Sequence, residues 1–385
     1  MKNNKQIVLI LTIGVFSIIN TEMGVTGILP LIAEKYGITI SIAGLLVSLF
    51  ALVVAISGPT MPLLFSGVNR KTVMILALGA FTVCNIVSAF TTSFPVLLIA
   101  RVLPAFLHPV YVSMAMSVAG ASVEKSEAPQ AIAKVMMGVS AGMVLGVPIV
   151  SFISRTTTLQ IGMLFFAGVS ALSLIATIIC IPSMKVEHRM SYGSQLSILK
   201  RANVWISFFG VMCLNGSIFG IYSYLSEYME KVTNLSGTWI SVLLLIYGLA
   251  NIVGNYIAGK LLSSRPIQLV FTFPLAMGLL YILLNFLGSF SMPMIMLTLV
   301  WGVMAGIAAN IHQYWMESAA PEAPDFSNGL FLAATNLGTT VATTVCGFVI
   351  AQFGISYLIL GGLLFLIFAI VLLNMRIQLF EKNVK

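Results

Sequence analysis

The stretch QIVLILTIGVFSIINTEMGVTGILPL, residues 6–31, is long enough to cross a bilayer and contains one charged residue, Glu22. A hydrocarbon core about 30 Å thick requires roughly 20 apolar residues in a spanning helix. Similar stretches recur along all 385 residues, of which 59% are hydrophobic and 8% charged. An ordinary soluble domain is about 25% charged. The composition excludes a soluble globular protein and predicts an all-α membrane protein.

Apolar windows predict twelve spanning helices in two groups of six. A polar connection separates the sixth span from the seventh, so we predict an N-terminal six-helix bundle at 1–181, a cytoplasmic linker at 182–202 and a C-terminal six-helix bundle at 203–385. The predicted spans are 7–30, 42–65, 72–90, 95–119, 131–153, 161–181, 203–227, 238–262, 267–288, 292–316, 327–350 and 354–376.

The basic residues indicate orientation rather than a nucleic-acid partner. The formal net charge is +8, but Lys and Arg are scattered in ones and twos between apolar segments. Cytoplasmic connections of membrane proteins are rich in Lys and Arg, so we expect both termini to be cytoplasmic, in a cytoplasmic (inner or plasma) membrane. This places Lys35, Arg155 and Lys231 outside, and inside Lys2, Lys5, Arg70, Lys71, Lys125, Lys134, Lys185, Arg189, Lys200, Arg201, Lys260, Arg265, Arg376, Lys382 and Lys385.

The two halves resemble each other at a shift near 196 residues. The segment GLLVSLFALVVAISG at 44–58 pairs with ISVLLLIYGLANIVG at 240–254. Internal repeats are typical of secondary transporters. Asn20 is repeated as Asn215, whereas Glu22 is replaced by Ser217. The acid is therefore not a requirement of the helical fold.

The acid Glu22 lies inside the first predicted span, and Arg101 and His108 lie inside the fourth. An ionised group in hydrocarbon costs at least about 2.5–3.5 kcal/mol, so each needs a physical reason. Measured from the span ends near Pro30 and Pro95, Glu22 lies about 12 Å deep and Arg101 about 9 Å deep. Either Glu22 carries protons, with Arg101 changing its proton affinity as the helices rearrange, or Glu22 and Arg101 form a static ion pair. His108 either belongs to the proton route or, as is common for a lone histidine in a membrane, only hydrogen-bonds a neighbouring helix.

Polar and aromatic side chains in the spans predict a cavity for an organic molecule of mixed polarity. Hydrogen bonds between helices are the alternative for each of them. The candidate cavity residues are Asn20, Asn215, Tyr222, Tyr247, Asn251, His312 and Gln313.

The segment TEMGVTGILPLIAEKYGITISIAGLLVSLFALVVAISGP, residues 21–59, resembles the opening of sugar, purine and drug efflux permeases. With the twelve spans, this likeness identifies the chain as similar to the drug and metabolite proton antiporters of the major facilitator superfamily. The resemblance implies two pseudo-symmetric six-helix bundles that alternate access to a central cavity, and export driven by protons.

Three motifs of that family are visible. PLLFSGVNRKT, residues 62–72, keeps Arg70 and Lys71 but has Ser66 in place of the usual Asp, which leaves the two bases as topology markers or contacts to neighbouring helix ends. RVLPAFLHP, residues 101–109, keeps the buried Arg, and its two prolines should bend the span. GVSAGMVLGVPIVS, residues 138–151, closely matches the antiporter motif. Its Gly138, Gly142, Gly146 and Pro148 predict close helix packing and a pliable contact between the halves.

We therefore expect a proton-coupled exporter of a small organic molecule, with protons and the lipid bilayer as its other partners. We expect a monomer that uses no cofactor, metal or nucleic acid. The alternatives are an importer or facilitator in which Glu22 is structural and, more distantly, a membrane sensor. An enzyme is not expected, because Glu317, Glu322 and Asp325 share one loop without a catalytic His or Ser. That acidic loop either contacts Arg70, Lys71 or Arg265 or is solvated. No P-loop sequence is present.

Overall fold

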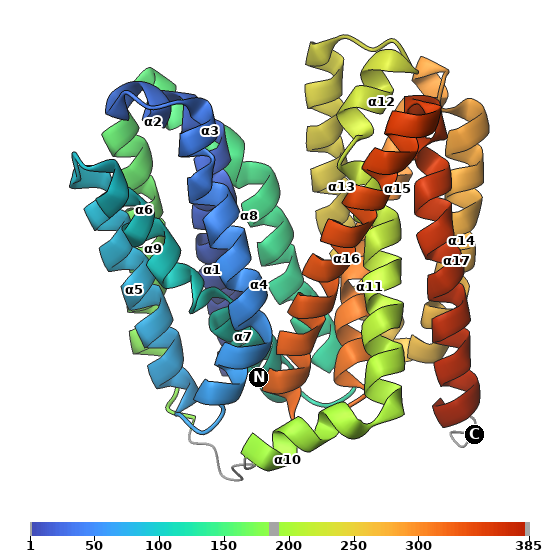
Figure 1. Ribbon diagram of the computed structural model, residues 1–385. Coiled ribbons are helices and arrows are strands. Elements are labelled where there is room, and N and C mark those ends of the chain that lie inside the picture. Colours follow the sequence, from blue (N-terminus) through green and yellow to red (C-terminus); the bar gives the residue numbers. More distant parts are fainter. Residues whose placement is uncertain (1, 185–191, 382–385) are drawn as a thin grey trace. The chain divides into compact units, whose positions relative to one another are not determined.

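The computed structural model describes residues 2–184 and 192–381 and divides into two compact units, Met1–Tyr192 (unit 1) and Gly193–Lys385 (unit 2). Each unit is a bundle of helices (Figure 1). Among the described residues, twelve helical segments are long and apolar enough to span a membrane, which confirms the all-α membrane fold. Lys185, Arg189, Lys382 and Lys385, used above for orientation, lie outside the described residues, as do 185–191 of the predicted linker.

Unit 1 contains the first six spans, and two of them are interrupted. Its elements are α1 (Lys2–Gly24), η1 (Val25–Ile28), α2 (Leu29–Tyr36), α3 (Ile40–Ala43), α4 (Leu45–Phe65), α5 (Arg70–Phe90), α6 (Phe94–Ala105), α7 (His108–Ala121), α8 (Ala128–Thr156) and α9 (Leu159–Cys180). The first span comprises α1, η1 and α2, and the fourth comprises α6 and α7.

Unit 2 contains the remaining six spans. Its elements are η2 (Ile198–Lys200), α11 (Ala202–Tyr222), α12 (Leu225–Lys231), α13 (Gly237–Ser264), α14 (Pro266–Leu287), α15 (Ser291–Glu317), α16 (Pro324–Phe353), η3 (Ile355–Tyr357), α17 (Leu358–Arg376) and η4 (Ile377–Glu381), preceded by the short α10 (Tyr192–Ser197) at the boundary between the units.

The two units repeat one packing pattern. In unit 1, α1 packs on α8 and α9, α5 packs on α9, and α4 packs on α6 and α7. In unit 2, the equivalent contacts join α11 to α16 and α17, α14 to α17, and α13 to α15. The same pairs of spans therefore meet in both units, as expected if the weak sequence repeat reflects a structural repeat.

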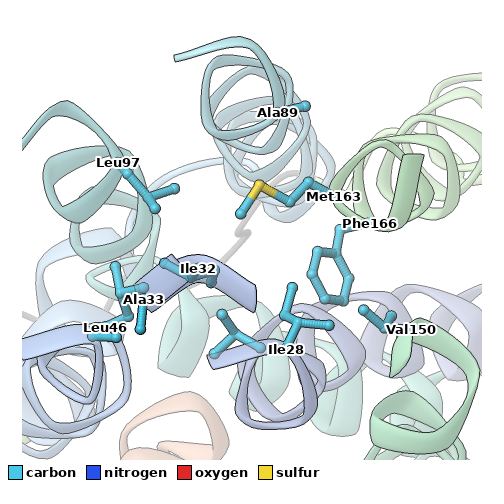
Figure 2. Close-up of a cluster of buried hydrophobic side chains, with 11 residues drawn as sticks. Ile28, Ile32, Ala33, Leu46, Ala89, Leu97, Val150, Met163 and Phe166 are labelled. Carbon is cyan, nitrogen blue, oxygen red and sulfur yellow. The ribbon is translucent and has the colours of Figure 1, made fainter. Parts of the chain in front are cut away.

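The first span is longer than its sequence suggests. The apolar window predicts an end near Pro30, but α2 continues the span to Tyr36, and Gly37 ends it with a φ of +62°. A cluster of buried apolar side chains from η1, α2 and the neighbouring helices holds this extension in place (Figure 2). Glu22 consequently lies near the middle of the span Lys5–Tyr36, which is deeper than the roughly 12 Å predicted.

Candidate functional site

The first span breaks directly after Glu22. Helix α1 ends at Gly24, where an added Cβ would lie 2.6 Å from the ring of Phe166. Carbonyls in the last turn of a helix lack amide donors in a following turn and attract positive charge. Arg101, which is 3% exposed, donates from Nη2 to the carbonyl oxygen of Thr21 at 2.5 Å. Its guanidinium also lies 5.6 Å from the centre of the Phe166 ring. Arg101 thus stabilises the broken end of α1.

The fourth span breaks at the residues that bring a titratable ring to Glu22. Helix α6 ends at Ala105, one residue after Pro104, and α7 begins at His108 with Pro109 in its first turn. The bend predicted from the two prolines is confirmed. An unbroken helix would separate Arg101 from His108 by about 10 Å along its axis. Because of the break, both side chains reach adjacent residues of α1.

Glu22 pairs with His108. Its Oε2 lies 3.1 Å from Nε2 of the ring, and the two side chains are 14% and 5% exposed. This is an ion-pair distance without the angle of a hydrogen bond. The ring of Phe50 packs edge-on against the imidazole, with centroids 6.0 Å apart. Since His108 opens α7, the positive end of that helix dipole also lies on this side of the carboxylate.

The alternative of a direct Glu22–Arg101 ion pair is wrong for this conformation. Within the part of the chain that the structure describes, Glu22 forms its ion pair with His108, and Arg101 bonds Thr21. Arg101 still lies close enough to Glu22 for their charges to attract. Glu22, Arg101 and His108 are called the Glu22 cluster below.

A buried hydrogen-bond network that the sequence analysis missed adjoins this cluster. Asn85 of α5 donates to Oγ1 of Thr21 at 3.2 Å and to Oγ of Ser170 at 3.4 Å. Ser170 of α9 in turn lies 3.0 Å from Ser17 of α1. Isolated polar residues in otherwise apolar spans were the available signal. The network joins three spans at the depth of the cluster.

The glycines of the antiporter motif bring α8 close to α1. An added Cβ at Gly138 would meet the carbonyl oxygen of Thr12, and one at Gly142 would lie 2.8 Å from Cβ of Ile19. Helix α8 continues through Pro148 to Thr156. The close packing predicted from these glycines is therefore confirmed. The helix that packs against them, α1, belongs to the same unit as α8.

The repeated asparagines differ in their surroundings. In unit 2, Asn215 donates to the carbonyl of Thr335 at 2.7 Å and to Oγ1 of Thr339 at 2.9 Å, which ties α11 to α16. In unit 1, Asn20 is fully buried against Gly146, and neither of its amide atoms has a hydrogen-bond partner among the described residues. The asparagine therefore ties the two spans together in unit 2, whereas in unit 1 it packs against the glycine without a hydrogen bond among the described residues.

Two of the candidate cavity residues of unit 2, Tyr222 and Tyr247, belong to an aromatic cluster. Tyr222 of α11 stacks on Tyr247 of α13, with centroids 4.7 Å apart and an interplanar angle of 26°. Trp301 of α15 packs edge-on against Tyr247 at 5.6 Å. Tyr222 is partly exposed, whereas Tyr247 and Trp301 are buried. The three rings form one aromatic cluster, in which Tyr222 is the most accessible ring.

The amide side chains of unit 2 are engaged in hydrogen bonds within and between helices. Asn255 donates to Oδ1 of Asn251 at 3.1 Å and accepts from Asn310 at 2.6 Å. Gln313 donates to Asn328 at 2.8 Å and to Glu317.

Most of the candidate cavity residues are buried. Asn20, Asn215, Tyr247, His312 and Gln313 are almost inaccessible, and only Tyr222 and Asn251 are partly exposed. Within residues 2–184 and 192–381, no group of His, Cys, Asp and Glu could hold a metal ion.

The loop motif contacts a neighbouring helix end. Asn69 caps α5 by accepting from the amide of Lys71 at 3.0 Å, and its Nδ2 donates to Ser183 at 2.7 Å. Nζ of Lys71 donates to the carbonyl of Ile178 at 2.7 Å, in the last turn of α9. The backbone amide of Arg70 donates to the carbonyl of Met184 at 3.2 Å.

Arg376, which the charge count treats as a cytoplasmic base, is 1% exposed at the end of α17. Its guanidinium donates to Oγ of Ser207 and to Oγ of Ser318, both at 2.8 Å, and lies 4.0 Å from the centre of a Trp315 ring. This residue joins α11, α15 and α17.

The acidic loop contacts a base that was not among the expected ones. Glu322 forms an ion pair with Arg201 at 2.5 Å, and both side chains are partly exposed. The pair connects the loop after α15 to the residue that precedes α11.

Twelve spans in two repeated units, with charged groups in their interior, define a polytopic membrane transporter. A model of the Major Facilitator Superfamily matches residues 11–331. The chain belongs to this superfamily and is a multi-pass membrane transporter of small molecules.

Two relatives span nearly the whole chain. The inner membrane transport protein YdhP of Escherichia coli (strain K12) is 27% identical over 349 residues, which cover 91% of this chain and 90% of YdhP. The MFS-type transporter YtbD of Bacillus subtilis (strain 168) is 28% identical over 387 residues, which cover 99% of this chain and 98% of YtbD.

Solved structures share the fold at low identity. The human organic anion transporter MFSD10 superposes with a TM-score of 0.78 at 14% identity, covering 96% of this chain and 99% of its own. The E. coli fucose:proton symporter FucP also superposes with a TM-score of 0.78, at 16% identity, covering 95% of this chain and 97% of the FucP chain.

Proposed function

We propose that this chain exports a small organic molecule across the cytoplasmic membrane in exchange for protons, by alternating access. The observation that carries the proposal is the contact between Glu22 and His108, two titratable groups 3.1 Å apart near the middle of two broken spans. Intramembrane ionisable residues mark proton relays in transporters. Discontinuous helices place such groups near the middle of the bilayer.

Protonation of Glu22 is the proposed switch. The ionised carboxylate attracts His108 and the positive end of α7, which holds the first span to the fourth. A proton on Glu22 removes this attraction and weakens the connection between the two spans. Arg101 remains on the last turn of α1 in both states and keeps the broken end of that helix in place. The glycine contacts between α1 and α8 allow the two helices to shift against each other.

The energy of one proton suffices for useful export. A proton that moves down a membrane potential of about 100 mV supplies about 2.3 kcal/mol, which supports roughly a 50-fold concentration gradient at one-to-one exchange. We propose that both termini face the cytoplasm, because the Lys and Arg of the short connections gather on that side.

Proteoliposomes test the assignment of Glu22. The variant Glu22→Gln removes the titratable proton and keeps the size of the side chain, and Glu34→Gln is a matched control because Glu34 is an exposed acid of the same span. Pyranine trapped in the vesicles reports proton movement while a panel of candidate compounds is added under an imposed pH gradient. We expect compound-dependent proton flux in the wild type and in Glu34→Gln.

In Glu22→Gln we expect that flux to disappear while exchange of labelled for unlabelled compound, which needs no proton, continues. The retained exchange shows that the variant is folded. If proton flux persists at the wild-type rate in Glu22→Gln, Glu22 is not the proton carrier. The carboxylate would then only tie the two spans together, whereas compound uptake without proton flux in the wild type would identify a facilitator.

A further inference from the structure

The charge of the Glu22 cluster restricts what can bind beside it. The other acids of the described chain lie at or near the ends of spans or in connections: Glu34, Glu124, Glu127, Glu227, Glu230, Glu317, Glu322, Asp325 and Glu381. Glu22 is thus the one carboxylate in the middle of a described span. It is accompanied by the buried cation Arg101 and by His108, which is neutral or positive.

No protonation state of this cluster carries net negative charge. With Glu22 ionised and His108 neutral, the charges of Glu22 and Arg101 cancel. Protonation of either Glu22 or His108 makes the cluster positive. A buried charge must be compensated by an opposite charge, because the free-energy cost of removing it from water is otherwise not offset. A permanent cation therefore finds no uncompensated partner here, and an approach to Glu22 also brings it towards Arg101.

An anion fits the cluster only when Glu22 or His108 is protonated, so the anion and the proton would bind together. Simultaneous binding leads to transport of both in one direction, which is the opposite of exchange. A molecule that exchanges with protons must instead bind the ionised carboxylate. An uncharged hydrogen-bond donor does this, because a carboxylate accepts several hydrogen bonds and a protonated one accepts fewer.

We propose that the exported molecule is uncharged and bears a hydroxyl or N–H group that donates to Glu22 in place of His108. This inference rests on the proposed exchange with protons and adds the chemical class of the molecule. The contact between Glu22 and His108 is suited to replacement, since the ring lies at ion-pair distance but lacks the angle of a hydrogen bond. The donor and the proton then compete for the same carboxylate.

Binding to the purified protein in detergent tests the inference without any gradient. The first probes are neohexyl alcohol, which is the uncharged carbon isostere of choline, then choline itself, and the methyl ether of neohexyl alcohol, which cannot donate. A pentitol, a hexose and a nucleoside extend the uncharged donors to larger sizes. Isothermal titration or equilibrium dialysis measures the dissociation constant of each compound over a range of pH.

We expect at least one uncharged donor to bind. Choline, which is cationic, and the methyl ether, which lacks the donor, should each bind at least tenfold more weakly than neohexyl alcohol. As the pH is lowered through the range in which Glu22 takes up a proton, the affinity for the donor should fall by up to tenfold for each pH unit. In Glu22→Gln, whose amide oxygen accepts fewer hydrogen bonds than a carboxylate, the affinity should be lower and should no longer change with pH, and Glu34→Gln should bind as the wild type does.

Choline that binds as tightly as neohexyl alcohol overturns the inference, as does equal binding of the ether. Failure of every uncharged donor to bind, or binding unchanged in Glu22→Gln, overturns it as well. These failures are distinct from failure of the proposed function. Proton-driven transport of a cation that depends on Glu22 would refute the substrate class and leave the coupling intact.

Discussion

Replacing Gly142 by alanine tests the close packing between α1 and α8. An added Cβ would lie 2.8 Å from both Cβ and Cγ2 of Ile19 and 3.1 Å from the amide nitrogen of Asn20. Carbon atoms pack best about 3.5–4.0 Å apart, so the helices must separate by nearly 1 Å. Ile19 is buried and β-branched, which prevents its side chain from turning away.

The matched control is Gly168→Ala in the neighbouring helix α9, where an added Cβ would meet nothing within 4 Å. Alanine gains about 1 kcal/mol over glycine in a helix, and this gain applies to both variants. Overpacking costs about 1–3 kcal/mol and applies only to Gly142→Ala. We therefore expect Gly142→Ala to be about 1–3 kcal/mol less stable than Gly168→Ala.

Thermal unfolding of the two purified variants in the same detergent, followed by tryptophan fluorescence, measures this difference. We expect the apparent Tm of Gly142→Ala to lie several degrees below that of Gly168→Ala. Equal Tm values for the two variants would show that α1 and α8 are not in the close contact that the structure places at Gly142.

Four further substitutions use the same unfolding assay. Asn215→Leu breaks two hydrogen bonds to α16 and should lower stability by about 1–3 kcal/mol. Asn20→Leu, at the repeated position, breaks no hydrogen bond among the described residues and should be neutral or stabilising. A greater loss in Asn20→Leu than in Asn215→Leu would contradict the different surroundings of the two asparagines. Arg101→Leu removes the charged hydrogen bond to the last turn of α1 and should cost about 1.5–3 kcal/mol, and a loss below about 1 kcal/mol would argue against its capping role. Arg201→Ala breaks only the partly exposed pair with Glu322 and should change stability by less than about 1 kcal/mol, so a larger loss would mean that the pair is shielded from solvent.

Much of the candidate site was visible as residue types out of place. Glu22, Arg101 and His108 stand out because charge is costly in an apolar span, and the two prolines near His108 predict the break. Arg376 was missed for the opposite reason. It lies where a span ends, and a base at a span end ordinarily faces water. Its burial depends on Ser207, Trp315 and Ser318, which come from other helices.

The sequence by itself determined the number of spans, their division into two similar halves and the presence of one acid in the membrane interior, because these follow from local hydropathy and the thickness of the bilayer. The choice of partner for that acid depended on tertiary structure. The break between α6 and α7 separates Arg101 from His108, and in the folded unit His108 reaches Glu22 while Arg101 reaches the backbone of Thr21. Spacing along an ideal helix could not predict that exchange of partners, since the direction in which each half-helix leaves a break is set by the packing of its neighbours.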